Sequence, residues 1–150
     1  NIFYHLGLAY YLDGDLEDAL EAWQRDLSLA VNDDMKVATM HWVYMTLREM
    51  HRDTEAYAVL TDITPEMNII ENQAYHKLCL FYKGEISFDE VLGSDQGVVM
   101  NDALLYGIGN WFLYNDNDQT RALEYFNRIF GAGSWASFGY IAAEVKSARF

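Results

Sequence analysis

The chain has little of the residues that shape turn-rich or cross-linked folds. It carries one proline, Pro65, among 150 residues, whereas proteins built from many β-turns or from long linkers normally carry more. It also carries one cysteine, Cys79, so no intrachain disulfide can form. Because the neighbours of Cys79 are apolar, we interpret it as a small buried side chain and not as a reactive thiol. These scarcities favour a helical fold held together by packing.

Basic residues are scarce as well. The chain has 10 Lys and Arg against 23 Asp and Glu, a formal net charge of −13. Such a surface repels phosphate, and no Lys/Arg stripe offsets it, so we expect no nucleic-acid binding and no attraction to an anionic membrane. No apolar run is long enough to span a bilayer, so we expect no membrane insertion. Basic or neutral partners remain open, although the acidic charge also has the simpler role of keeping an apolar-rich chain in solution.

What the chain does have is apolar sequence at helical spacing. Hydrophobic residues make up 51% and charged residues 22%, a globular and not a disordered composition. The opening segment reads Phe3-x2-Leu6-Gly7-x2-Tyr10, then Gly14-Asp15, then Ala19-x3-Trp23. This pattern predicts two helices separated by a break at Gly14, with Asp15 capping the second helix. The small Ala19 would let the paired helices approach, and Trp23 would fill the gap beyond it.

These residues resemble a tetratricopeptide repeat, whose signature is W-x2-L-G-x2-Y followed by A-x3-F. Phe3 replaces the tryptophan, Trp23 replaces the phenylalanine, and the closing proline is missing near Val31, which suggests an unusual connection there. Weaker or partial copies return in phase along the chain. They include Ala56-x3-Leu60, Tyr106-x-Ile108-Gly109-x2-Phe112 with Ala122-x3-Phe126, and Trp135-x2-Phe138-Gly139.

The resemblance implies an all-α fold, a right-handed α-solenoid of stacked antiparallel helix hairpins. We predict one domain over residues 1–150, with four hairpins and a terminal helix. The predicted hairpins cover 1–31, 34–64, 67–93 and 100–131, and the terminal helix covers 134–149.

Local signals refine these bounds. The distance from Ala19 to Ala56 is 37 residues, a little over the usual 34, and Asn32-Asp33-Asp34 is predicted to hold the extra residues. Pro65 is predicted to end the second hairpin. Ser87 and Glu90 have the form of a capping box, Gly93 is predicted to end the helix that follows, and 93–97 to be loop. The residues 115–118 are predicted to form a polar turn.

The chain begins inside a helical pattern, so we expect it to be part of a longer protein, whose compartment the sequence does not indicate. The loose, glycine-broken repeats are typical of a bacterial source.

In the tetratricopeptide family the first helix of each hairpin lines the concave side, so the resemblance implies a groove that binds a protein or peptide segment. The matching positions are largely aromatic, and tyrosine offers a large contact area with a hydrogen-bonding tip. They are Tyr4, Leu8, Tyr11, His41, Met45, Arg48, Leu78, Phe81, Tyr82, Asn110, Tyr114 and Tyr140, with Leu12, Ala38, Glu71, Leu113 and Glu144 beside them. Of these, Arg48 and Asn110 alone suit the clamp with which some family members bind acidic chaperone tails, and we interpret Arg48 as a solvated surface residue.

Our first reading is therefore a non-catalytic interaction scaffold without cofactor or metal. The second is a structural module that packs on another domain or self-associates through its exposed repeat ends, giving a homo-oligomer. The third is an enzyme with a polar pocket containing His41, Glu71 and His76. No histidine pair has the i, i+4 spacing of a helical metal site, and the acidic run at 115–118 lacks the glycine and glutamate of a calcium loop.

Overall fold

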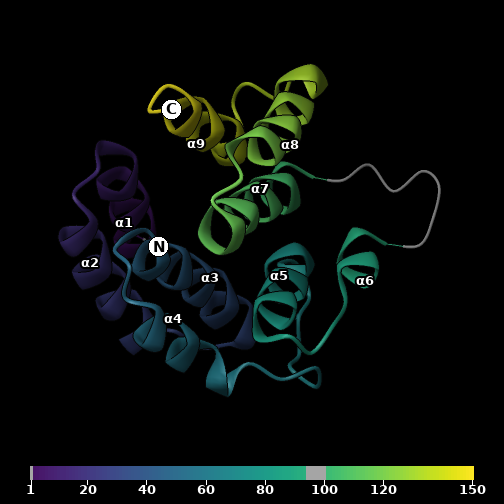
Figure 1. The fold of residues 1–150 in the computed structure, drawn as a ribbon. Helices are drawn as coiled ribbons and strands as arrows, with labels where there is room; N and C mark the ends of the chain where they lie inside the picture. Colours follow the sequence, from purple (N-terminus) through teal and green to yellow (C-terminus); the bar gives the residue numbers. More distant parts are fainter. Residues whose placement is uncertain (1, 94–100) are drawn as a thin grey trace. The chain divides into compact units, whose positions relative to one another are not determined.

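The protein is helical throughout the part of the chain that the structure describes. The computed structural model covers residues 2–93 and 101–150, where it contains helices and no β-strand (Figure 1). The prediction of an all-α protein is confirmed. The chain divides into two compact units, Asn1–Glu85 and Ile86–Phe150, and the segment predicted as the third hairpin, 67–93, spans this division. The loop predicted over 93–97 lies outside the described residues apart from Gly93.

The first unit is built around one long helix. It contains α1 (Ile2–Asp13), α2 (Leu16–Ser28), α3 (Asp33–Glu49), α4 (Asp53–Val59), the 3-10 helix η1 (Leu60–Asp62) and α5 (Gln73–Lys83). Helix α1 packs on α2, whereas α3 packs on α2, α4 and α5, and α5 also contacts η1. Helix α3 is therefore shared by three neighbours.

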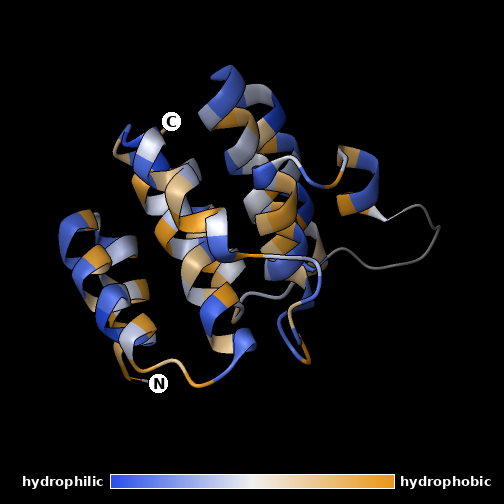
Figure 2. Ribbon diagram, turned by 90° about the horizontal axis from the view of Figure 1, so that it is seen from below, coloured by the Kyte–Doolittle hydropathy of each residue, from blue (hydrophilic) through white to orange (hydrophobic). Residues whose placement is uncertain are grey.

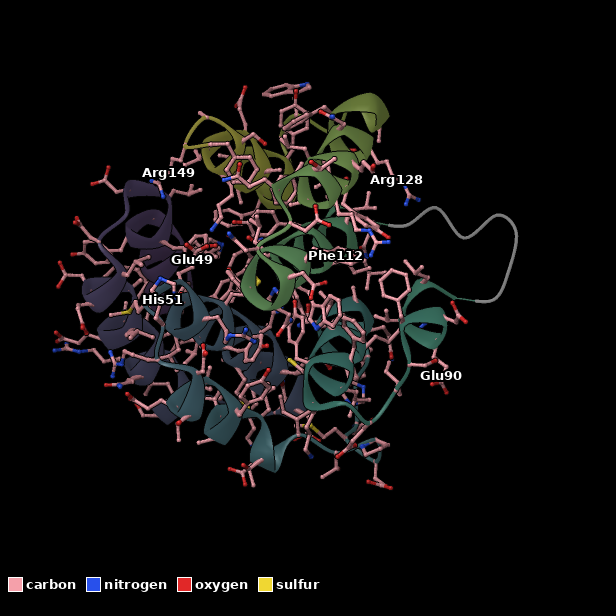
Figure 3. The ribbon with its side chains drawn as sticks, viewed as in Figure 1. Glu49, His51, Glu90, Phe112, Arg128 and Arg149 are labelled. Atoms are coloured by element: carbon pink, nitrogen blue, oxygen red, sulfur yellow. The ribbon has the colours of Figure 1, made fainter. Side chains whose placement is uncertain are left out.

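The second unit contains α6 (Phe88–Leu92), α7 (Asp102–Asp116), α8 (Gln119–Ala132) and α9 (Phe138–Ser147). Helix α7 packs on α8, and α9 packs on both. Phe112 belongs to α7 (Figure 3). Its ring lies edge to face with that of Phe88, with the centroids 5.9 Å apart, and this contact joins α6 to α7. Helix α9 is shorter than the predicted 134–149 because Ser137 caps it, its hydroxyl accepting from the Tyr140 amide at 3.1 Å.

Capping confirms some local predictions in full and others in part. The capping box is present: Ser87 Oγ accepts from the Glu90 amide at 3.2 Å, and Glu90 Oε2 accepts from the Ser87 amide at 2.6 Å. Asp15 stands at the N-cap position of α2, as predicted, but its backbone is not extended and its side chain makes no capping hydrogen bond. Asn32 caps α3, its side-chain oxygen accepting from the Met35 amide at 2.9 Å, so that α3 starts at Asp33.

A similar turn ends α1, α3, α5 and α7. Each turn contains a residue with positive φ, at Gly14, His51, Gly84 and Asn117, so the steps along the chain are 37, 33 and 33 residues. In the first three turns the next amide donates to a carbonyl five residues back at 2.9 Å, and the fourth turn is one residue longer. The predicted break at Gly14 is confirmed, and the turn predicted at 115–118 is shorter because α7 extends through Asp116.

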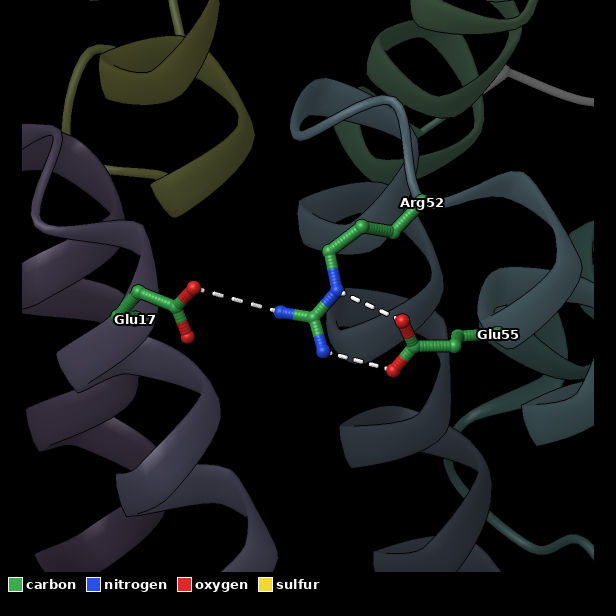
Figure 4. Close-up of polar contacts among 3 residues, drawn as sticks. All are labelled: Glu17, Arg52 and Glu55. Atoms are coloured by element: carbon green, nitrogen blue, oxygen red, sulfur yellow. Dashed lines mark hydrogen bonds and ion pairs between the residues drawn. The ribbon is translucent and has the colours of Figure 1, made fainter.

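Charged side chains link the helices of the first unit at the surface. Arg52, next to His51 in the turn after α3 (Figure 3), pairs with Glu55 at 2.7 Å and with Glu17 of α2 at 3.4 Å (Figure 4). Exposed ion pairs of this kind contribute about 0–1 kcal/mol each. Packing must therefore supply most of the stability of the unit.

The small-then-large pairs of the sequence lie in the core. Ala19 and Trp23 are fully buried, as are Ala122 and Phe126. A Cβ atom at Gly7 would lie 2.2 Å from Trp23 Nε1, and one at Gly109 would lie 2.5 Å from Phe126 Cε1. In both helix pairs a glycine therefore lets the second helix place an aromatic ring directly against the first. Hydrophobic and hydrophilic residues alternate along the helices (Figure 2).

Candidate binding site

Predicted groove residues of the first unit belong to a connected aromatic network. We use this name for Tyr4, Tyr11, Trp23, His41, Trp42, Tyr44, Tyr75 and Tyr82. The ring of Trp42 packs against Tyr11 at 5.4 Å and Trp23 at 6.2 Å between centroids. At the other end of the network Tyr44 and Tyr82 stack at 4.4 Å. The network thus runs from α1 to α5 through the residues of α3.

Tyr4 is held in place by three aromatic neighbours. Its hydroxyl accepts a hydrogen bond from Trp42 Nε1 at 3.0 Å, and its carbonyl accepts one from Trp23 Nε1 at 3.2 Å. Burial raises the pKa of the Tyr4 hydroxyl, with further contributions from Tyr75 and from the charge of Asp26. The hydroxyl is therefore neutral at physiological pH, and it lies within electrostatic reach of Asp26.

His41 is a buried imidazole in the middle of the network. Its ring lies 4.7 Å from that of Tyr75 and 5.8 Å from that of Tyr82, centroid to centroid. Neither ring nitrogen has a hydrogen-bond partner among the described residues. Burial lowers the pKa of His41 to about 3, so the ring is neutral and acts as an aromatic spacer.

Arg48 is not the solvated residue that the sequence suggested, since only 5% of its side chain is exposed. Its guanidinium donates to the hydroxyls of Tyr44 at 2.8 Å and Tyr57 at 3.0 Å, and it pairs with Asp53 at 2.9 Å. These bonds fasten α3 to α4, because Tyr57 and Asp53 both belong to α4. The interpretation of Arg48 as a surface residue is therefore wrong.

The remaining predicted groove residues of this unit are mostly part of its interior. Tyr11 is buried and donates its hydroxyl proton to Glu49 at 3.3 Å. Four apolar side chains are also buried, namely Leu8, Met45, Leu78 and Phe81. Tyr4 and Leu12 are half-buried, and Tyr4 also reaches the aromatic network through its hydrogen bond from Trp42.

Three of the predicted residues of the second unit lie on two of its helices. Asn110 of α7 is buried and donates its amide to the Tyr106 carbonyl at 2.9 Å. Tyr114 is half-buried, with Lys146 Nζ 5.6 Å from its ring centroid. Tyr140 of α9 packs edge to face on Phe130 at 5.2 Å. Each of the three is thus engaged with a different neighbour.

A surface pocket of about 190 Å³ lies where α1, α2 and α3 meet the residue that precedes α5. We call it the Asp26 pocket, and it is lined by Tyr4, Asp26, Met35, Ala38, Thr39 and Asn72. Asp26 is 1% exposed, and its Oδ2 accepts from the Thr39 hydroxyl at 2.5 Å. The pocket therefore combines a buried carboxylate, two hydroxyls and an amide with two apolar side chains.

The wall formed by Asn72 is held by a second carboxylate. Asp34, at the start of α3, accepts amide hydrogens from Ile70 at 2.9 Å, from Glu71 at 2.9 Å and from Asn72 at 2.8 Å. These bonds, led by the one from Asn72, lower the pKa of the Asp34 carboxyl. The Asn72 side chain in turn donates to the Asp34 carbonyl at 3.0 Å, so this side of the pocket is fixed to α3.

Sequence reasoning named Tyr4 and Ala38 of this pocket but missed its polar centre. One signal was present: Asp26 continues the buried stripe of α2 that includes Ala19, Ala22 and Trp23. An acidic residue on the core side of an amphipathic helix must find a polar environment. Its partner Thr39 and the wall at Asn72 belong to other helices and could not be assigned from spacing.

The other polar candidates, His41, His76 and Cys79, are each explained by their immediate neighbours. His76 Nε2 lies 2.8 Å from the Thr64 carbonyl, and His41 lies among aromatic rings, so the two are engaged in separate contacts. Burial raises the pKa of the Cys79 thiol, in agreement with its interpretation as a buried small side chain. Within residues 2–93 and 101–150 no three His, Cys, Asp or Glu side chains are placed to hold a metal ion. None of the helices described is both long and apolar enough to cross a membrane.

Comparison with known proteins gives no relative to guide the assignment: no family model matches the chain, and no curated protein or solved structure is significantly similar to it.

Proposed function

We propose that the chain is a tetratricopeptide-like interaction module, with its helix pairs stacked as an α-solenoid, that binds a peptide or protein segment without catalysis. The observation that carries the proposal is the recurrence of one packing device. Gly7 against Trp23 and Gly109 against Phe126 occupy equivalent places in two helix pairs. The turns of similar geometry support it further, since their spacing is close to the 34-residue period of that family.

The part of the module we assign to binding is the Tyr4 side of α1 with the Asp26 pocket. Repeat modules of this type use extended surfaces formed by successive helices. Tyr4 offers a half-buried ring there, and the pocket offers polar groups that can orient a ligand. A small number of placed polar groups among apolar walls is typical of binding sites.

The test is a selection from a random peptide library displayed on phage, followed by titration of the enriched peptides. We expect selected peptides to bind wild-type protein, and Tyr4→Ala to weaken them about tenfold or more, as for other central aromatic anchors. Tyr10→Ala is the matched control because Tyr10 belongs to the same helix but lines a different hollow. Circular dichroism verifies that both variants keep their helix content. Failure to enrich any peptide, or equal losses in both variants, would refute the assignment.

A second candidate function, self-association, is favoured by the other side of the α1–α2 pair. Ile2 is 77% and Leu6 40% exposed, and Leu6 lines a hollow of about 210 Å³ together with Phe3 and Tyr10. Exposed apolar patches mark interaction surfaces. Light scattering over a concentration series tests this candidate: an oligomer that Leu6→Glu dissociates supports it, and a monomer at every concentration rejects it.

A further inference from the structure

The Asp26 pocket has the composition of a site for a positively charged group. Of the six described residues that line it, one is acidic and none is basic. The acidic one, Asp26, is 1% exposed, and a carboxylate in such a place interacts strongly with a nearby cation because little water screens it. The whole chain also carries a net charge of −13, which attracts cations to its surface.

The pocket also has acceptors for a donor-rich ligand. An ammonium group has three N–H donors and no acceptor. The Asp26 carboxylate, the Thr39 hydroxyl oxygen and the Asn72 amide oxygen can each accept one. The Tyr4 hydroxyl oxygen already accepts from Trp42 Nε1 at 3.0 Å, so we do not count it among these acceptors. Asn72 is held in place by the hydrogen bonds to Asp34, which limits the reorganisation that binding requires.

The apolar part of the lining fits the stem of such a ligand. Met35 and Ala38 are the two apolar residues of the lining. A lysine side chain buries its methylene stem along apolar surface while its charged end seeks acceptors. A guanidinium is a planar fork that pairs best with both oxygens of one carboxylate, and Oδ2 of Asp26 already accepts from the Thr39 hydroxyl, which favours the single contact of an ammonium group.

We infer that the Asp26 pocket binds a primary ammonium group, and that this group is the side chain of a lysine in the bound peptide. The lysine part rests on the proposed function, because that function supplies the peptide. The ammonium part stands on the pocket alone. Asp26 supplies the charge, Thr39 and Asn72 orient the group, and Met35 with Ala38 contacts its stem.

A titration with n-butylammonium chloride, monitored by amide NMR signals of Thr39 and Asn72, tests the ammonium chemistry. 1-Butanol is the neutral ligand of similar shape, and sodium chloride controls for ionic strength. We expect saturable shifts with butylammonium and no saturable shifts with 1-butanol. Equal responses to the two ligands, or no response to either, would overturn the inference, and this comparison needs no variant.

Substitutions then locate the site. Asp26→Asn removes the charge and is expected to weaken butylammonium binding about tenfold or more. Asp18→Asn removes one charge from an exposed position of the same helix and is expected to leave binding unchanged. If Asp26→Asn does not fold, Ala38→Leu provides the second test, because it fills the pocket while keeping the carboxylate. Equal binding by wild type and a folded Asp26→Asn or Ala38→Leu variant would contradict the site.

The source of the ammonium is decided with a short peptide. Acetyl-Gly-Lys-Gly-amide is expected to bind at least as tightly as butylammonium, and the same peptide with an Nε-acetylated lysine is expected to bind about tenfold more weakly or not at all. Binding of butylammonium with exclusion of the lysine peptide would overturn the lysine assignment in favour of a free small amine. A failed library selection together with successful butylammonium titration would reject the proposed function while supporting the pocket.

Discussion

At the residue scale, single atoms decide how closely two helices pack. Gly109 of α7 faces Phe126 of α8, whose ring is fully buried and would lie 2.5 Å from an added Cβ. Gly131 of α8 is different, because a Cβ there would meet nothing within 4 Å. The two glycines belong to the same helix pair, so they allow a matched comparison of a required and a dispensable glycine.

We expect Gly109→Ala to lower the free energy of unfolding by about 1–3 kcal/mol, because the added methyl group overpacks the interface. Gly131→Ala is expected to raise it by about 0.5–1 kcal/mol, since alanine loses less backbone entropy in a helix. Urea unfolding followed by circular dichroism measures both. A Gly109→Ala variant as stable as wild type would contradict the close approach of Phe126.

His41 makes stability depend on pH. Its pKa in the folded protein is about 3, below the ordinary value of about 6.5 that it has when unfolded. The native state therefore keeps the ring neutral while the unfolded chain takes up the proton. The contribution of the neutral ring is complete above about pH 6.5 and is lost as the pH falls from there towards 3.

Because the unfolded chain protonates His41, we expect the free energy of unfolding to be about 2 kcal/mol lower at pH 5 than at pH 8. His41→Phe should lack that part of the loss, because phenylalanine cannot be protonated. His5→Gln is the control, since His5 is exposed, and it should keep the wild-type pH dependence. Urea unfolding between pH 5 and 8 makes the comparison, and identical slopes for wild type and His41→Phe would refute the role of His41.

At the element scale, the turns after α1, α3, α5 and α7 each contain a residue with positive φ, but the residue type differs. Gly14 and Gly84 adopt positive φ without steric cost, as glycine does. His51 adopts φ of 58° with a side chain that opposes it. The hydrogen bond from the Arg52 amide to the Leu47 carbonyl at 2.9 Å shows that the turn after α3 closes in the same way.

We expect His51→Gly to raise the free energy of unfolding by about 0.5–1 kcal/mol. Glycine removes the strain of the left-handed conformation, and this gain exceeds the loss caused by the greater entropy of the unfolded chain. Thr54→Gly is the control nearby: Thr54 lies exposed in α4, where glycine should destabilise by about 0.5 kcal/mol. Thermal unfolding ranks the three proteins. A loss of stability in His51→Gly would show that the histidine side chain itself stabilises the turn.

A helix end could be predicted from the sequence where the capping side chain bonds to a residue within the same turn. Ser87 and Glu90 satisfy each other's backbone across one turn, so their sequence alone identified the capping box. Asp15 has the right residue type but the wrong backbone conformation for a cap. That conformation follows from how the turn after Gly14 joins two packed helices, which spacing does not reveal.

At the scale of the whole molecule, the chain divides into two compact units. The first unit ends at Glu85, after α5 has packed on α3 and η1. Its core includes Leu78 and Cys79 of α5, both fully buried. The similarity of the repeats had favoured one continuous stack, and the division after α5 depends on which helices bury each other's apolar faces.

We expect a fragment of residues 1–85 to fold alone, with helical circular dichroism and cooperative unfolding monitored by Trp23 and Trp42 fluorescence. A fragment of residues 1–62 lacks α5 and exposes the side of α3 that α5 covers. Because each large apolar side chain contributes about 1.5–3 kcal/mol when buried, this shorter fragment should lose at least about 3 kcal/mol or unfold without cooperativity. Equal stability of the two fragments would show that α5 does not belong to the first core.

The sequence by itself determined the helical class, the buried small-then-large pairs and the acidic surface, because these follow from residue type and 3.6-residue spacing along one helix. Only the tertiary structure decided what the polar groups do. It buried Arg48 between α3 and α4 and surrounded His41 with aromatic rings. It also placed Asp26, Thr39 and Asn72 around one pocket. Those arrangements join residues far apart in the chain, and their proximity arises from the packing of whole helices, which no local pattern encodes.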